Sequence, residues 1–418
     1  MNLNGISPVC LHNSLTQLKP DKIALLSQTK KEIADFCHSN SLWKDRYYHQ
    51  FPTYGFQTKK RYDNVDWLSR YAKRYAIMSN IKSHKPKVKS FVNDKIINIK
   101  TLTNAFAYNT SDSISIVVYD YFDNECLYEQ AATFKVKNKD FVFLDTRTLI
   151  SVDEDSISIF DLEKHQKVTE HQVHFGTSPH IQPIDSTSFA VISNGQCIVY
   201  DVKQQLNRKC TFIHNNDVIG TASDGQKIYI ASEKDLTAHD TSNPRGPILW
   251  NYIQMEGAKF CSFNVKSKRA LFGNKIINLN NGVEVSQFHN DDTVCGAIAN
   301  DHIAVFGCSR RAVIFFDYVE SKVVGQYQFS VSEGIKSIDS AITNDNVAVA
   351  ADFNIKILKL PDKDGNVEEI RKVNCGSIGQ RKTGEIDAVK QVVFDGERLI
   401  TNMNKFVRVY DFYTGKTL

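Results

Sequence analysis

Apolar and polar residues alternate in short runs along most of the chain, as they do in strands that bury one face. The run from Phe406 to Tyr410 leads into Asp411 and then into a polar turn. Similar runs, each ending in an acidic residue, occur at Asp161, Asp201 and Asp317. The pattern therefore predicts a mainly β protein from about residue 87 onwards.

These strand ends recur at a nearly constant spacing. With weaker copies included, the series of landmarks is Asp120, Asp161, Asp201, Asp240, Asn278, Asp317, Lys359 and Asp411. The successive separations are 41, 40, 39, 38, 39, 42 and 52 residues. A period near 40 residues, with several short strands in each repeat, predicts a β-propeller. We count eight blades, with seven as the alternative because the strands of the fifth repeat, 260–264 and 270–273, are short.

The landmarks resemble the strand-ending Trp-Asp of WD repeats, with Phe or Tyr in place of Trp, over roughly the last four fifths of the chain. In that family an outer strand follows each landmark, and the chain ends too soon after Asp411 to form one. We therefore expect a strand at 88–92 to pair with the last strand and close the ring, which removes an exposed sheet edge. The resemblance also implies that His214 and His289 are buried and hydrogen-bonded within their blades.

The N-terminal residues have a different pattern, with apolar side chains at helical spacing. Thr29 and Glu32 have the spacing of a capping box, and the helix that follows places Ile33, Phe36 and Cys37 on one face. Helices this short bury little surface by themselves, so we expect them to pack on the propeller or on a partner.

The segment from Leu11 to Phe51 resembles an F-box. The resemblance is carried by a leucine pair, by Leu-Ser-Gln-Thr at 26–29 and by Ser-Leu-Trp-Lys at 41–44, whereas the usual Leu-Pro-x-Glu start is absent. It implies binding to a Skp-type adaptor. The residues that it assigns to adaptor binding are Leu11, Leu15, Leu18, Pro20, Ile23, Leu26 and Trp43. The alternative is a helical cap that only supports the propeller.

Three parts follow from these patterns: an F-box-like helical domain at 1–52, a helical linker at 53–86 and a WD-type propeller at 87–418. Within the linker, residues 66–75 have apolar side chains at helical spacing and Lys and Arg on the other face. Basic residues among aromatic ones could suggest stacking on nucleic acid. We interpret the segment as an amphipathic helix packed on its neighbours, because the periodicity accounts for it.

The composition is that of an ordinary soluble globular protein, with 42% hydrophobic and 23% charged residues. The net charge of +4 is too small to predict binding to nucleic acid or to a membrane surface. No apolar run reaches the ~18 residues of a membrane span, and the N-terminus lacks the features of a secretory signal. Nine scattered cysteines without a CxxC pair predict reduced thiols, and hence a cytoplasmic or nuclear protein.

We find no motif typical of catalysis, nucleotide binding or metal binding in the sequence. It contains no HExxH, no P-loop, no GxSxG and no GxGxxG after a strand, so it predicts neither an enzyme nor a metal or cofactor site. In WD-type propellers the turns between the second and third strands share one face. Among the charged residues that we place in those turns, blades five, six and eight carry only basic ones, which are Lys275, Arg310, Arg311 and Lys405. Such residues could bind an acidic or phosphorylated peptide, although exposed turns are commonly charged.

F-box proteins with WD-type propellers are substrate receptors of cullin–RING ubiquitin ligases. The resemblance therefore implies that the N-terminal helices bind a Skp-type adaptor and its cullin, and that the propeller binds a protein substrate. The alternative is a non-catalytic propeller scaffold, or a trafficking or assembly component, with no link to ubiquitin.

Overall fold

The computed structural model defines the chain in segments. It describes residues 14–15, 18, 20–28, 31–50, 66–69, 71–72, 84–92, 95–102, 105–122, 125–145, 147–176, 178–203, 206–214, 218–243, 247–254, 256–290, 292–330, 334–340, 346–352, 354–375, 388–394, 398–403 and 406–417.

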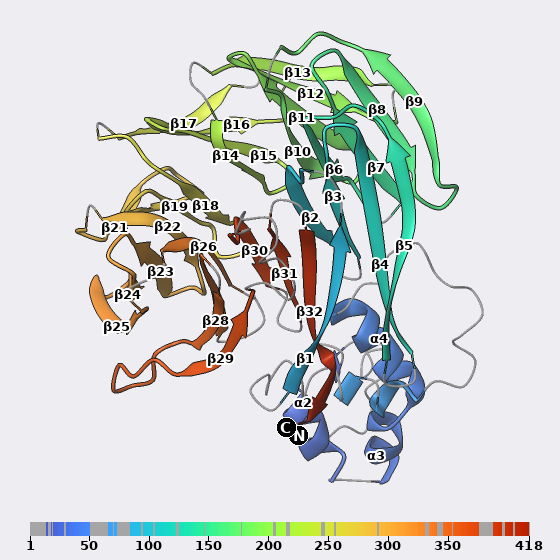
Figure 1. Ribbon diagram of the computed structural model, residues 1–418, viewed down its shortest axis with the longest axis vertical. Coiled ribbons are helices and arrows are strands. Elements are labelled where there is room, and N and C mark those ends of the chain that lie inside the picture. The colour runs from blue at the N-terminus through green and yellow to red at the C-terminus, as the bar shows by residue number, and fades with distance from the viewer. Residues whose placement is uncertain are drawn as a thin grey trace, which may run out of the picture.

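Eight four-stranded antiparallel sheets form the blades of a β-propeller (Figure 1). The prediction of eight blades is confirmed, and the fifth blade has strands of only four residues each. The first strands of successive blades lie next to each other from blade one round to blade eight, so they form the inner ring. The fourth strand is the outer one, and in blade two it is exposed along its whole length.

In seven blades the four strands follow one another in the chain. Blades one to four are β2 (Asn98–Leu102), β3 (Ala105–Asn109), β4 (Ser113–Phe122), β5 (Glu125–Lys135); β6 (Asp140–Phe143), β7 (Thr148–Val152), β8 (Ser156–Asp161), β9 (Gln166–Gln172); β10 (His180–Asp185), β11 (Ser188–Ser193), β12 (Gln196–Asp201), β13 (Asn207–Ile213); and β14 (Val218–Ser223), β15 (Lys227–Ser232), β16 (Asp235–Asp240), β17 (Ile248–Ile253). Blades five to seven are β18 (Cys261–Asn264), β19 (Arg269–Phe272), β20 (Lys275–Asn278), β21 (Glu284–Gln287); β22 (Thr293–Ile298), β23 (Ile303–Cys308), β24 (Ala312–Asp317), β25 (Lys322–Gln328); and β26 (Ile335–Ser340), β27 (Asn346–Ala351), β28 (Asn354–Lys359), β29 (Glu369–Asn374).

Blade eight combines both ends of the propeller. Its strands are β30 (Gln391–Phe394), β31 (Arg398–Asn402), β32 (Phe406–Thr417) and, as the outer strand, β1 (His84–Val92). β1 pairs antiparallel with β32, with Val88 opposite Tyr410. β1 begins three residues before the expected start of the propeller at 87. This extension is possible because Pro86 lies at a register shift in an outer strand, where its missing N–H is tolerated.

The repeated landmark residue has a local structural role. Asp161 and Asp317 each end a third strand and accept the backbone N–H two residues further on, at 2.9 Å in both cases. The equivalent residues of blades three, four and five do the same: Asp201, Asp240 and Asn278. This Asx turn bends the chain into the outer strand. In blade eight Asp411 is buried within β32, which continues without a turn.

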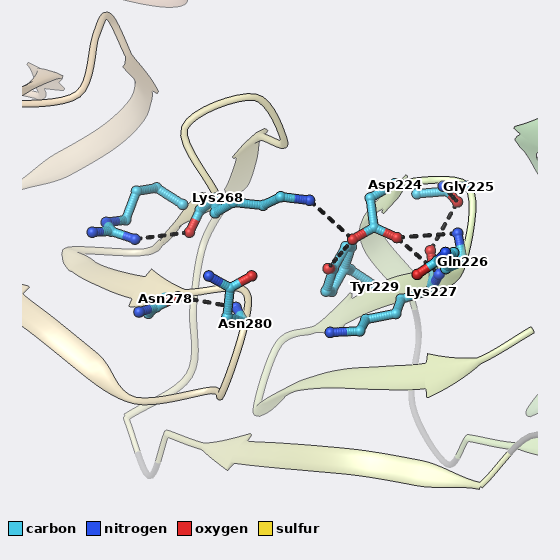
Figure 2. A network of polar contacts seen from close by, with 10 residues as sticks. Asp224, Gly225, Gln226, Lys227, Tyr229, Lys268, Asn278 and Asn280 are labelled. Carbon is cyan, nitrogen blue, oxygen red and sulfur yellow. Dashed lines mark hydrogen bonds and ion pairs between the residues drawn. The ribbon is translucent and has the colours of Figure 1, made fainter.

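Neighbouring blades are joined by polar as well as apolar contacts. In blade four, Asp224 accepts hydrogen bonds from the Tyr229 hydroxyl at 2.8 Å and from the backbone N–H of Lys227 at 2.9 Å. Lys268 of blade five lies 3.1 Å from the same carboxylate (Figure 2). Burial opposes ionisation of Asp224, but these hydrogen bonds outweigh it and hold the pKa of the carboxyl below its usual value. The ion pair thus links blades four and five.

The N-terminal helices are gathered beside the propeller (Figure 1). They are α2 (Pro20–Leu26), α3 (Lys31–Cys37) and α4 (Asn40–Gln50). Their buried side chains form one small core with two aromatic residues of the following segment: Leu15, Ile23, Ile33, Cys37, Leu42, Trp43, Trp67 and Tyr71. The helices therefore have a core of their own, whereas we expected them to pack on the propeller or on a partner.

Arg46 stabilises this helical core from within. It is buried, its guanidinium lies over the rings of Trp43 and Tyr71, and it donates a hydrogen bond to the Leu15 carbonyl at 2.6 Å. The Trp43 and Tyr71 rings are 4.9 Å apart between centroids. The segment after the helices thus packs on them, through Trp67 and Tyr71.

Candidate protein-interaction sites

Most of the residues predicted to bind an adaptor lie in the core of the helical unit. Leu15, Ile23 and Trp43 are buried, so the structure places them in the helical core and not on its surface, and their role in adaptor binding stays a prediction. Leu26 is half-buried against the same core, and Leu18 is 36% exposed. The two remaining predicted residues are Leu11, which lies outside the described part of the chain, and Pro20, which begins α2 but whose side chain is not described.

The sequence analysis missed Leu25. Its side chain is 60% exposed on α2, two residues from the buried Ile23 and hence on a different face of the helix. In the described part of the helical unit, Leu18 and Leu25 are the large apolar side chains that face solvent. A signal was present in the adjacent leucines at 25 and 26, because a helix cannot bury both neighbours on one face.

Lys275 does not present its charge as predicted. It begins β20, and its Nζ lies 3.3 Å from Oε2 of Glu284 on the outer strand of its own blade. The Tyr252 hydroxyl of blade four donates to the same carboxylate at 2.5 Å. The Tyr252 hydroxyl and, secondarily, Glu284 raise the pKa of Lys275. Lys275 therefore holds blades four and five together.

One residue of the predicted arginine pair, Arg310, forms an ion pair. Arg310 is exposed in the turn between β23 and β24, and its Nε lies 2.7 Å from Oδ2 of Asp292. Arg311 has a left-handed backbone, with φ of 67°, and its N–H donates to the Cys308 carbonyl at 2.9 Å. Lys405 lies outside the described residues. Glu284 and Asp292 therefore offset the charges of Lys275 and Arg310, and the predicted role of the four basic residues in substrate binding stays a prediction.

A cavity of about 270 Å³ opens between blades four, five and six. Its lining comes from the connections between those blades and from the turn between the second and third strands of blade five, which is the face on which the sequence analysis placed the substrate. The lining residues are Gln254, Glu256, Gly257, Lys259, Phe260, Gly273, Asn274, Asn290 and Thr293. Gly273 has φ of +59°, a conformation that favours glycine in this tight turn.

Three buried polar side chains of this cavity have unused hydrogen-bonding capacity. Gln254 is only 5% exposed, and its Oε1 has no hydrogen-bond partner. Asn274 and Thr293 are also buried, and within the described part of the chain their side chains make no hydrogen bond. Buried polar groups are nearly always satisfied in proteins, so the unsatisfied Gln254 oxygen, with the polar side chains of Asn274 and Thr293 beside it, gives this cavity a place for a polar ligand.

The histidines differ from their predicted roles. His289 is exposed, so the expectation that it is buried is wrong, whereas His214 is half-buried with its Nε2 shielded from solvent. Among the histidines whose side chains are described, the buried one is His239, which stacks on Phe212 with ring centroids 3.9 Å apart and hydrogen-bonds Thr237 at 3.2 Å. Across the described ranges no three potential ligands gather to hold a metal ion, and no helix there is long and apolar enough to cross a membrane.

Comparison with known proteins gives structural but not sequence relatives. No protein-family model matches the chain, and no curated protein matches it. The C-terminal WD40 domain of Sif2 is similar in structure, with a TM-score of 0.61 and 11% identity over 78% of this chain and 99% of that domain. The fold is a WD40-type β-propeller.

Two other solved structures are similar over a comparable share of the chain. The computationally designed protein Ika8 has a TM-score of 0.58 at 12% identity, over 76% of this chain and 96% of that one. BamB from Moraxella catarrhalis has a TM-score of 0.54 at 12% identity, over 78% and 98%. At these identities the likeness concerns the fold alone.

Proposed function

We propose that the chain is a substrate receptor of a cullin–RING ubiquitin ligase, in which the helical unit binds a Skp-type adaptor and the propeller binds a protein substrate. The resemblance of residues 11–51 to an F-box suggests this role. The observation that carries the proposal is the exposure of Leu25 on α2, together with Leu18 in the bend before it, beside a helical unit that has a core of its own. Exposed apolar side chains of this size are suited to a partner that covers them.

In this role the chain does no bond chemistry of its own. It holds the substrate close to the ubiquitin-conjugating enzyme and so raises the effective concentration of substrate lysines. The geometry suits this task, because the helical unit and the propeller have separate cores. We place this activity in the cytoplasm or the nucleus.

Capture of the adaptor by the tagged full chain tests the proposal. The double variant Leu18→Asp with Leu25→Asp should lose at least about tenfold in capture of adaptor and cullin, because two charges replace the apolar contact. Val168→Asp is the matched control, since Val168 is 59% exposed but lies on the propeller. Both variants should melt like the wild type. Adaptor capture that the double variant leaves unchanged would refute the proposal.

A non-catalytic scaffold is the second candidate. It is favoured by the burial of Leu15, Ile23 and Trp43 in a core that needs no adaptor to complete it. A wild-type chain that captures protein partners but neither adaptor nor cullin would establish this role instead.

A further inference from the structure

We propose that the cavity between blades four, five and six binds the uncharged carboxamide side chain of a glutamine or asparagine in a partner peptide. The inference rests on the proposed function, because it specifies what the propeller recognises in a protein substrate. It does not depend on the helical unit, whose residues are absent from the cavity.

The lining of the cavity has unused hydrogen-bonding capacity. Gln254, Asn274 and Thr293 are buried, and Oε1 of Gln254 is not satisfied by any protein group. Either orientation of the Gln254 carboxamide leaves one of its polar atoms in need of a partner. A ligand that supplies the missing partner regains hydrogen bonds that the free protein lacks, which favours binding.

The polar groups of the lining are complementary to a carboxamide. A carboxamide has both donors and acceptors, so it can exchange hydrogen bonds with Gln254 and Asn274 and contact the Thr293 hydroxyl. A carboxylate or a phosphate only accepts hydrogen bonds, so it can bond to the Gln254 amide nitrogen but not to the Gln254 oxygen, whereas a carboxamide can pair with either. An aliphatic side chain would satisfy none of the three groups.

The charged residues around the cavity favour a neutral ligand. Lys259 is the single cation among the lining residues, and it lies exposed together with Glu256 of opposite sign. Lys275 and Arg310, the nearby cations of blades five and six, have the carboxylates of Glu284 and Asp292 as partners. A phosphate would therefore lose part of its hydration beside cations that already have carboxylates as partners, whereas a neutral ligand has no such cost.

The size of the cavity fits one side chain with its adjoining backbone. Its volume of about 270 Å³ is below the ~300–1,000 Å³ typical of small-molecule pockets. Phe260, which is half-buried, provides an apolar wall for the methylene groups of a glutamine.

A peptide library probes the proposal directly. The immobilised full chain is presented with short peptides whose central residue is fixed as Gln, Asn, Glu, Leu or phosphoserine while the flanking positions are random. We expect Gln and Asn to be enriched about tenfold over the other three, from roughly two additional hydrogen bonds. Gln254→Met and Thr293→Val remove polar groups at nearly constant volume, and each should reduce the enrichment by about threefold to tenfold.

Matched variants make the result interpretable. Thr169→Val removes a hydroxyl from an exposed outer strand and should leave the enrichment unchanged. Enrichment of Glu or phosphoserine that is lost in Arg310→Glu with Arg311→Glu would overturn the proposal in favour of the basic turn. Absence of any enrichment, or enrichment that survives both cavity substitutions, would also overturn it.

The same preparations separate this proposal from the proposed function. Adaptor capture without Gln or Asn enrichment contradicts the carboxamide site and leaves the ligase role standing. Enrichment without adaptor capture contradicts the ligase role and leaves the site standing.

Discussion

Removal of the last strand should open the propeller and unfold it. A chain that ends at residue 403 lacks β32, the strand that pairs with both β31 and β1. Four of its side chains, Val407, Val409, Tyr410 and Phe412, are at most 2% exposed. They belong to a core cluster that also contains Phe106 of blade one, so the deletion disrupts the junction at which the ring closes.

The magnitude follows from burial. At about 1.5–3 kcal/mol for each buried side chain, the four residues contribute about 6–12 kcal/mol, before the loss of strand pairing is counted. The total stability of a domain is about 5–15 kcal/mol, so little or none remains after the deletion. β1 also loses its partner strand and becomes an unpaired segment.

Thermal melting followed by circular dichroism, together with size-exclusion chromatography, measures the effect. We expect the 1–403 chain to be aggregated or to lack a cooperative transition. A control chain that ends at residue 412 keeps the four buried side chains and should melt cooperatively, at a somewhat lower temperature than the full chain. A soluble 1–403 chain with a cooperative transition near that of the full chain would refute the account of ring closure.

Three further predictions concern single side chains. Gln254→Met should raise the free energy of unfolding by about 1–2 kcal/mol in urea titrations, because it removes an unsatisfied buried polar group. A less stable variant would show that the Gln254 oxygen is not buried without a hydrogen-bond partner. Burial opposes ionisation of Glu369, but hydrogen bonds from Tyr327 and Lys356 hold the pKa of its carboxyl below 4.5. The contribution of Glu369 to the free energy of unfolding is therefore present above pH 4.5 and is lost as the pH falls through the pKa of the folded protein. Glu369→Gln should therefore flatten the loss of stability below pH 4.5, and an unchanged acid profile would show that the contact does not matter. Among the outer strands of the described sheets, β17 is the one without a charged residue, and its Ile253 is 64% exposed. Ile253→Lys should therefore reduce self-association, measured by light scattering at high protein concentration. Unchanged association would show that the chains do not associate through β17.

The blade count was predictable because each landmark acts locally. An aspartate such as Asp161 or Asp317 is needed where it stands, since it caps the turn that follows its own strand. Its position in the sequence therefore marks a position in the fold. The outer strand of blade eight was predictable for a related reason, because a propeller without it would leave β32 unpaired on one side.

The sequence pattern did not determine which residues of the helical unit face its core. α2 has only seven residues, so its pattern cannot determine whether Ile23 or Leu25 faces the core. The answer depends on Trp67 and Tyr71, which join the core from a segment that the sequence analysis assigned to the linker. Burial of the charged Arg46 also depends on those aromatic partners, and the spacing of apolar residues does not predict it.

The cavity could not be predicted, because its lining comes from three blades. Gln254 follows β17, Asn274 lies in a turn of blade five and Thr293 begins β22. Charge in the sequence pointed instead to Lys275, but a lysine's position does not reveal that Tyr252 and Glu284 will engage it from neighbouring strands. Only the packing of blades against one another decides which polar groups are paired.

Calorimetric titration of the purified full chain with a purified Skp-type adaptor tests the central claim most directly. The account predicts saturable one-to-one binding at micromolar affinity or better, and at least about tenfold weaker binding by the Leu18→Asp, Leu25→Asp chain. It also predicts unchanged binding by Gln254→Met, because the cavity lies on the propeller. No heat of binding from the wild-type chain, or equal affinity in the double variant, would contradict the account.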